Sequence, residues 1–335
     1  MKKHIYILII LFLTAFVTFS CSENKTEKKS ISIKKEEPKA KIKVPDFNSD
    51  SAYKYVEKQV EFGPRVPNTP AHEKCAKFLV SKLKTFSSNV EIQKFKVKAY
   101  NSEILNGKNI IASFNPETKN RVLLCAHWDS RPYADHDPDK NNHNTPIDGA
   151  NDGASGVGVL LEIARQLSID PPPIGIDIIL FDVEDYGEPQ DYVTDKQDNW
   201  CLGSQYWSRN PHIPYYSANY GILLDMVGGY DPTFTLEMTS MYYAPDIMKK
   251  VWETAHNIGY RDYFLYEQTG ALIDDHLYIN QIIKIPTIDI VQYDPNTNSH
   301  FFEHWHTIDD NIECIDKETL KIVGQTVLTV IYKEV

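Results

Sequence analysis

The residues best suited to chemistry lie at the ends of short apolar segments. Glu184 and Asp185 are adjacent carboxylates at the end of the apolar run IDIILFDVED. Burying two neighbouring carboxylates is costly unless a metal ion or a shared proton compensates. Adjacent side chains on an ideal strand point to opposite faces. We therefore expect this pair where the strand ends and the chain turns, close to Gly187.

Other metal-capable residues follow the same pattern. They are His127 and Asp129 after RVLLCA, Asp225 after YGILL, Asp152 in the turn GANDGAS, and His306 in HWHTIDD after IPTIDIVQY. In open α/β sheets, sites form outside the carboxyl ends of the strands, so these side chains are predicted to converge. Histidine nitrogen and carboxylate oxygen suit zinc, and three protein ligands with one open position make a catalytic site. One carboxylate of the adjacent pair would then bind the ion, while the other serves as a general acid/base.

The elements that must position these residues alternate along the chain. Buried strands are predicted at NIIASF, RVLLCAHW, IDIILFDV, YGILLDMV and IPTIDIVQY, and a half-exposed strand at VEIQKFKVKAY. Helices are predicted after the N-cap Thr69, after GANDGAS, over Pro245 to Ile258, and from about Asp316. This alternation indicates an α/β fold, a single domain with a mixed, largely parallel central sheet flanked by helices.

The first residues predict export. MKKH is a basic start, IYILIILFLTAFVTF is a short apolar core, and Cys21 follows, so residues 1–21 are typical of a lipoprotein-type signal segment. A plain secretory signal or an uncleaved anchor is the alternative. Residues 22–45 are rich in Lys, Glu and Ser and predict a flexible tether, and residues 46–335 the catalytic domain. We expect a bacterial lipoprotein facing the periplasm or exterior, with membrane contact only through its lipidated N-terminus.

Composition narrows the possible partners. The net charge of −11 argues against nucleic acid. The cysteines after Cys21 form no C-x-x-C pair, which argues against a zinc ribbon or a dense disulfide scaffold. We expect a monomer, with Trp200, Trp207 and Trp252 in the core.

Seven ordered segments carry a family resemblance from FGPRVPNTPAHEK onward. They are FGPRVPNTP, AHWDSRP, DGANDGASG, FDVEDYG, LLDMVG, DDH and WHTIDDN. Together they resemble the zinc-dependent aminopeptidase family M28, and more closely its glutaminyl cyclase branch. The resemblance implies a zinc aminopeptidase-like fold and a glutaminyl-peptide cyclotransferase, which converts the N-terminal Gln of peptides or proteins to pyroglutamate and releases ammonia.

The resemblance also implies roles for individual residues. It makes Asp152, Asp185 and His306 the ligands of one zinc ion. It implies that Glu184 is the acid/base, that Asp274 and Asp225 are partner acids in a hydrogen-bond network, and that Trp305 is an apolar wall of the substrate pocket.

An M28-type di-zinc aminopeptidase is the alternative function. Peptidases of this family hold a second zinc through the equivalents of His127 and Asp225, and this chain has both residues. Two details favour the cyclase, namely Trp305 where peptidases usually have Tyr, and Asp274 where they commonly have a small residue. A non-catalytic binding protein is disfavoured because the acid/base and ligand positions are intact.

Overall fold

The computed structural model describes residues 43–193 and 198–334, which belong to one compact unit. The predicted signal segment and residues 22–42 of the predicted tether lie outside this part of the chain. Residues 43–45, the end of that tether, have no regular secondary structure. No helix within the described ranges is both long enough and apolar enough to cross a membrane.

The unit contains eight α-helices and eight β-strands within the described residues. The helices are α1 Ser49–Val60, α2 Pro70–Lys84, α3 Ala154–Ile169, α4 Leu202–Arg209, α5 Met238–Tyr243, α6 Pro245–Asn257, α7 Asp275–Tyr278 and α8 Lys317–Tyr332. The strands are β1 Asn89–Lys98, β2 Ile104–Phe114, β3 Arg121–His127, β4 Gly175–Phe181, β5 Tyr220–Asp225, β6 Phe234–Glu237, β7 Phe264–Thr269 and β8 Thr287–Val291. Three single-turn elements are added: the 3-10 helices Lys140–Asn142 and Ile312–Cys314, and the π-helix Ile279–Ile283.

The main sheet has the order β1-β2-β4-β3-β5-β8. Strands β4, β3, β5 and β8 are mutually parallel, whereas β2 pairs antiparallel with both β1 and β4. This confirms the predicted single α/β domain with a mixed, largely parallel sheet. The parallel pair β6–β7 forms a second, two-stranded sheet that the sequence pattern did not predict.

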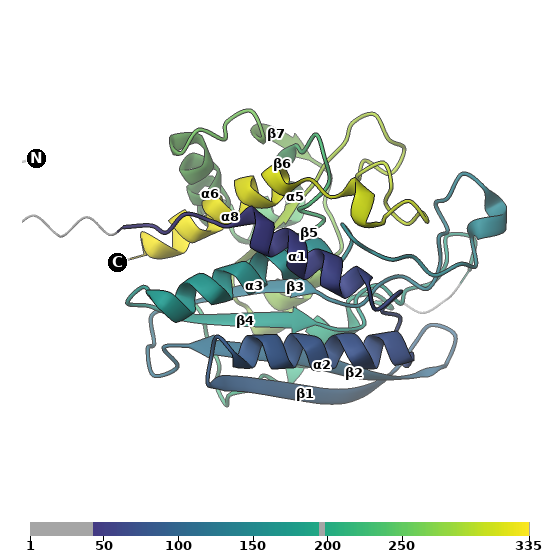
Figure 1. The fold of residues 1–335 in the computed structure, drawn as a ribbon, viewed down its shortest axis with the longest axis horizontal. Helices are drawn as coiled ribbons and strands as arrows, with labels where there is room; N and C mark the ends of the chain where they lie inside the picture. The colour runs from purple at the N-terminus through teal and green to yellow at the C-terminus, as the bar shows by residue number, and fades with distance from the viewer. Residues whose placement is uncertain (1–42, 194–197, 335) are drawn as a thin grey trace, which may run out of the picture. The chain divides into compact units, whose positions relative to one another are not determined.

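Helices cover both faces of the main sheet. Along β3, Val122, Leu124 and Ala126 belong to a large core that also contains residues of α1, α2, α3 and α8, the helices in front of the sheet in Figure 1. Leu123 and Cys125 face the other way, into a smaller core with Trp207 of α4. The alternation of side chains along a strand thus fills two cores at once.

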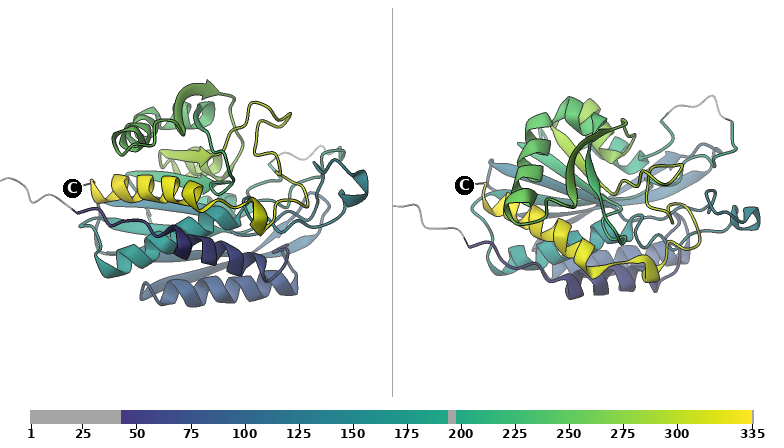
Figure 2. Two further views of the ribbon diagram at one scale, coloured as in Figure 1. Left: turned by 45° about the horizontal axis from the view of Figure 1, so that its top comes forward. Right: turned by 90° about the horizontal axis from the view of Figure 1, so that it is seen from above.

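The chain reverses its winding direction at β3. After β3 the chain passes through α3 to β4 on one side, and after β4 it passes through α4 to β5 on the other side. Such a switch point leaves a crevice outside the carboxyl ends of the strands. His127, Phe181, Asp225 and Val291 are the last residues of the four parallel strands, so the segments after them meet at this crevice. The segment with α6 and the β6–β7 sheet, green in Figure 2, lies beside the yellow helix α8.

Glycines bring α3 close to the sheet. A Cβ atom on Gly156 would lie 2.2 Å from the carbonyl oxygen of Leu224 in β5. Gly153, which precedes α3, has φ +96°, and a Cβ atom there would lie 2.6 Å from the carbonyl oxygen of Asp129. Only glycine fits such positions without a shift of the backbone. The close approach places Asp152, one residue earlier, at the crevice.

Candidate active site

The adjacent carboxylates lie in a sharp turn after β4. The strand ends at Phe181, and Glu184 and Asp185 follow in a bend rather than within the strand. Val183 precedes them with φ +60°, which is unusual for a β-branched residue and costs conformational energy. The structure thus confirms the prediction that the pair lies where the strand ends.

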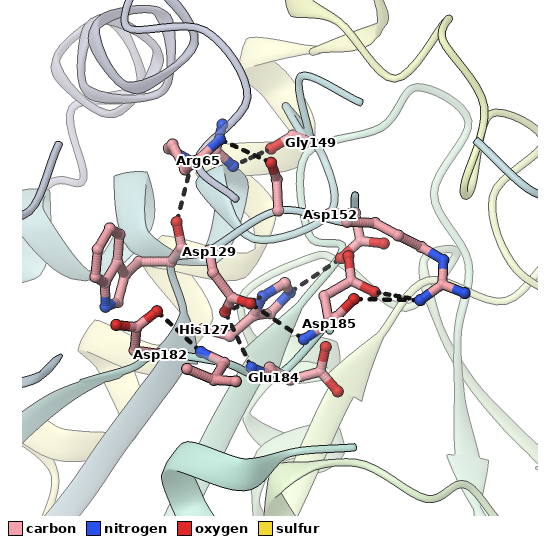
Figure 3. Close-up of polar contacts among 12 residues, drawn as sticks. Arg65, His127, Asp129, Gly149, Asp152, Asp182, Glu184 and Asp185 are labelled. Carbon is pink, nitrogen blue, oxygen red and sulfur yellow. Dashed lines mark hydrogen bonds and ion pairs between the residues drawn. The ribbon is translucent and has the colours of Figure 1, made fainter. Parts of the chain in front are cut away.

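A buried carboxylate holds this turn in place. Asp129 accepts the main-chain N–H groups of Glu184, at 3.1 Å, and of Asp185, at 3.2 Å (Figure 3). Asp129 is fully buried. Its position after β3 made it a metal-capable candidate, but the structure gives its oxygens to the backbone of the turn.

A second buried carboxylate does the same for the turn that contains Asp152. Asp310 accepts the main-chain N–H groups of Asn151, at 2.7 Å, and of Asp152, at 3.0 Å. Arg65 adds a further tie, because its guanidinium donates to the carbonyl oxygens of Trp128, at 3.0 Å, and Gly149, at 2.7 Å (Figure 3). Both turns that carry predicted ligands are therefore fixed by buried side chains.

The predicted zinc ligands converge. The Nε2 atom of His306 lies 3.3 Å from Oδ1 of Asp185 and 3.5 Å from Oδ2 of Asp152. The three side chains are buried, and their candidate ligand atoms lie within 4.8 Å of one another. Oδ2 of Asp185 has no hydrogen-bond partner among the described residues. One imidazole nitrogen and two carboxylates, with an unpartnered oxygen, fit a zinc ion.

A second group shares one of these ligands. The Nε2 atom of His127 lies 3.0 Å from Oδ1 of Asp152 and 3.2 Å from Oδ1 of Asp225. Asp152 thus presents one oxygen to His306 and the other to His127. The geometry brings together every residue that a one-zinc or a two-zinc site would use.

Arg131 and Asp135 support the ligand group from behind. Asp135 faces the Nδ1 atom of His306 at 3.4 Å, and it accepts two hydrogen bonds from Arg131, at 2.8 and 2.6 Å. Arg131 also donates to the carbonyl oxygen of Asp185 at 3.2 Å. A carboxylate behind a ligating histidine fixes its ring orientation and raises its basicity. The sequence reading missed both residues, although they lie within or just after the matched segment AHWDSRP.

Burial and mutual repulsion perturb the acids of the site. Burial raises the pKa of Glu184 well above its usual value, and the carboxylates of Asp274 and Asp185 add to the effect. Burial also raises the pKa of Asp185 to about 6, with a further contribution from Asp152. Burial raises the pKa of Asp225 to about 7. Perturbed acids of this kind, gathered at one cavity, are typical of catalytic sites.

Cys201 contacts Glu184 from the start of α4. Its thiol donates to Oε1 of Glu184 at 3.1 Å, and its main-chain N–H donates to the carbonyl oxygen of Glu184 at 2.9 Å. Cys201 has φ +56°, and Met226 and His306, which also contribute to the site, have φ +46° and +55°. Including Val183, four non-glycine residues with left-handed backbone conformations therefore surround the carboxylates.

The predicted partner acids occupy the same cavity but are not directly joined. Asp225 and Asp274 both line it, yet within the described residues no hydrogen bond connects them. Asp274 instead lies within 4.8 Å of the ligand atoms of two groups, one formed by Glu184 and Cys201 and the other by Asp289 and His276. Asp289, buried in β8, is an acid that the sequence reading missed. A charged residue inside the apolar run IPTIDIVQY was the available signal.

A cavity of about 240 Å³ opens onto these groups. Carboxylates and His306 line its polar end, and its apolar walls are Trp200, Met226, Leu272, Ile273, Val291, Phe301 and Trp305. Trp305 lies where the resemblance implied. The expectation that Trp200 lies in the core was wrong, because the guanidinium of Arg131, 4.5 Å from its ring centroid, supports Trp200 at the cavity wall.

The fold and this site define a class of protein. Residues 109–331 match peptidase family M28, and the chain belongs to this family. A similar solved structure is described as a Zn-dependent exopeptidase, which agrees with the ligand group described above.

Within the family, the named relatives include glutaminyl cyclases and an exopeptidase. A glutaminyl cyclase of Bacteroides thetaiotaomicron, solved with N-acetylhistamine, is 55% identical, with a TM-score of 0.85 over 87% of this chain and 99% of that one. A Zn-dependent exopeptidase of Parabacteroides distasonis is 56% identical, with a TM-score of 0.86 over 87% of this chain and 100% of that one. The bovine glutaminyl-peptide cyclotransferase is 27% identical over 63% of this chain. The match spans 62% of the bovine protein, less than two thirds of its length.

Proposed function

We propose that this chain is a zinc-dependent glutaminyl-peptide cyclotransferase that converts N-terminal Gln of peptides and proteins to pyroglutamate and releases ammonia. The observation that carries the proposal is the small cavity in which the Glu184 carboxyl stands beside the ligand group of Asp152, Asp185 and His306, between walls of Trp200 and Trp305. The relatedness to bacterial and animal glutaminyl cyclases supports the same activity.

Glu184 moves the protons of this reaction. The α-amino nitrogen of the substrate attacks its own γ-carboxamide carbon, so one C–N bond forms within the residue and the bond to the amide nitrogen breaks. Glu184 accepts the proton from the α-amino group and returns it to the departing ammonia. Asp152, Asp185 and His306 would hold a zinc ion, which would supply Lewis-acid polarisation to the substrate's carboxamide. Burial raises the pKa of Glu184 well above its usual value, which suits a group that must both take and give a proton.

The cavity walls position the substrate for this attack. Nucleophile and electrophile belong to one residue, so the pocket has only to fold the side chain back toward the α-amino group. Trp200, Phe301 and Trp305 surround the space next to the carboxylates. These rings exclude water, which would otherwise compete as the nucleophile and yield Glu instead of a ring.

A di-zinc aminopeptidase is the second candidate, and the group His127, Asp152 and Asp225 is the observation that favours it. Our proposal assigns one zinc per chain, with His127 and Asp225 joined through hydrogen bonds instead of a second ion. The test is ammonia release from Gln-peptides together with metal quantification. One zinc with ammonia release supports the cyclase, whereas two zincs with released amino acids would establish the peptidase.

The same proposal covers the N-terminal residues. The sequence of residues 1–45 supports a lipid-modified Cys21 and a tether that hold the enzyme at the bacterial membrane, facing the periplasm or exterior. The proposed enzyme is a monomer. Cys21→Ala should abolish incorporation of a labelled fatty acid into the protein without changing its activity. Equal labelling of the variant and the unmodified enzyme would contradict a lipid anchor at Cys21.

A further inference from the structure

A second cavity adjoins the catalytic one. Its volume is about 360 Å³, and Leu272, Val291 and Phe301 line both cavities. The remaining lining residues are Thr235, Glu237, Thr269, Gly270, Ala271, Gln292, Tyr293, Ser299 and His300. The shared wall makes the second cavity the neighbouring space for any substrate that extends beyond the first.

The catalytic cavity is too small for a whole peptide. At about 240 Å³ it lies below the range of roughly 300–1,000 Å³ that is usual for ligand pockets, so it accommodates a single residue. An extended chain advances about 3.3–3.6 Å per residue, so a peptide substrate must leave this cavity one or two residues after its N-terminal Gln. The second cavity is large enough to receive them.

One wall of the second cavity is the segment after β7. The carbonyl oxygen of Gly270 accepts the main-chain N–H of Met238 at 3.2 Å, and the carbonyl oxygen of Leu272 accepts the hydroxyl of Thr239 at 2.8 Å. The hydroxyls of Thr235 and Thr269 are 2.8 Å apart. These bonds tie the segment to β6 and to the start of α5, so the wall is held in a defined position.

The opposite wall is the loop between β8 and the HWH segment. The main-chain N–H of Asp294 donates to the carbonyl oxygen of His300 at 2.9 Å, and the hydroxyl of Thr297 donates to the carbonyl oxygen of Phe301 at 2.8 Å. The rings of Tyr293 and His300 stack with centroids 5.6 Å apart. These contacts are all within the loop, so the loop keeps its own shape. The cavity lies between this loop and the segment after β7.

The lining is almost free of charge. Glu237 is its one carboxylate and is only 1% exposed, since its oxygens accept hydrogen bonds from the main-chain N–H of Thr239, at 2.7 Å, and contact His276, at 3.1 Å. The other lining groups are hydroxyls, amides, aromatic rings, the imidazole of His300, and small or aliphatic side chains. Such a surface favours uncharged side chains, because the lining contains no Lys or Arg to pair with a carboxylate, and its one imidazole, that of His300, stacks on Tyr293.

From this arrangement we propose that the second cavity binds the second and third residues of the substrate peptide and selects uncharged, apolar side chains there. This inference rests on the proposed cyclase function. It extends the part of the substrate that the enzyme recognises from the N-terminal Gln to the first three residues.

Gly270→Leu tests the inference. A Cβ atom at Gly270 would meet no atom within 4 Å, and the backbone has no positive φ, so the fold has room for a side chain that narrows the cavity. We expect kcat/KM for glutamine amide, which ends inside the catalytic cavity, to stay within about twofold. For Gln-Leu-Phe-amide we expect a fall of about 10- to 100-fold, the effect of losing one buried apolar side chain. In the unmodified enzyme, Gln-Asp-Asp-amide should be a poorer substrate than Gln-Leu-Phe-amide.

Controls separate the possible failures. Ser81→Leu, at an exposed position of α2 near the opposite edge of the sheet, should change kcat/KM for neither substrate. Ala271→Phe narrows the same cavity and replaces Gly270→Leu if that variant does not fold. An equal effect on both substrates, or no effect on either, would overturn the inference. Absence of ammonia release from glutamine amide by the unmodified enzyme would instead overturn the proposed function.

Discussion

The thiol of Cys201 and the carboxyl of Glu184 form a hydrogen bond of 3.1 Å, and a second bond of 2.9 Å joins the main chains of the same two residues. Cys201 is fully buried and precedes α4 in a left-handed conformation. One residue therefore fixes both the backbone and the carboxyl group of the proposed acid/base. This pairing makes Cys201 a positioning residue for Glu184.

Cys201→Ala should lower kcat on a Gln-peptide by about tenfold and leave the zinc content unchanged, because one hydrogen bond to an ionisable group is lost while the ligands stay in place. Cys201→Ser should recover part of the loss, since a hydroxyl can donate the same bond. Steady-state kinetics with metal analysis gives the answer. Equal activity of Ala and Ser variants would show that the thiol acts only through packing.

Glu184→Gln should retain zinc and lose turnover by about 10²- to 10⁴-fold, the range expected when a general acid/base is removed. The amide keeps the size of the side chain but cannot take up the α-amino proton. Ammonia release and metal content should be measured on the same preparation. Substantial activity in this variant would refute the assignment of Glu184.

His306→Ala should lose both zinc and activity, because it removes the nitrogen that faces Asp152 and Asp185 at 3.5 and 3.3 Å. His304→Ala is the matched control. His304 is two residues away, and its Nε2 atom contacts the hydroxyl of Tyr230 at 3.0 Å rather than the ligand group. Metal quantification should therefore separate the two variants, and equal zinc loss in both would contradict the ligand assignment.

Glu237→Gln should make the protein's stability less sensitive to acid. Burial raises the pKa of Glu237, but the hydrogen bond and charge of His276 together with the hydrogen bonds from Ser240 outweigh this effect, so the pKa in the folded state lies below the ordinary value of 4.5. The unfolded chain then binds more protons, so the stabilisation present above pH 4.5 is lost as pH falls toward the folded-state pKa. Urea unfolding near neutral pH and below pH 4.5 should show a smaller loss for the variant. An equal loss would mean that other acids control this pH dependence.

The sequence predicted the helices and strands whose ends or apolar patterns are encoded by residues close together in the chain. The Thr69 hydroxyl accepts the main-chain N–H of His72 at the start of α2, and Asp316 caps α8 in the same way. The apolar runs form the central strands, because helices cover both faces of a parallel sheet and its strands therefore need apolar residues on both sides. Strand β6 is four residues long and half of β7 is exposed, so neither carries a periodicity that would distinguish it from a loop.

The site was predictable where function depends on residue type at the end of a strand, and unpredictable where it depends on long-range contacts. Asp177 and Asp289 illustrate the difference, since both interrupt apolar strands. Asp177 pairs with Arg121 at 2.5 Å and is structural, whereas Asp289 lies beside Asp274, which lines the cavity. The roles of Asp129 and Asp310 depend on main-chain N–H groups 55 to 159 positions away, a relation that only the folded chain reveals.

The left-handed turns at Val183, Cys201, Met226 and His306 have a consequence for engineering. Each such residue costs roughly 1–3 kcal/mol, held only by the packing around it. Selection of variants for heat resistance alone should therefore replace Val183, Cys201 or Met226, for instance with Asn or Gly, and lower the catalytic rate. The same replacement at His306 would also remove a proposed zinc ligand. Gains sought at the distant edge formed by β1 and α2 would avoid these losses.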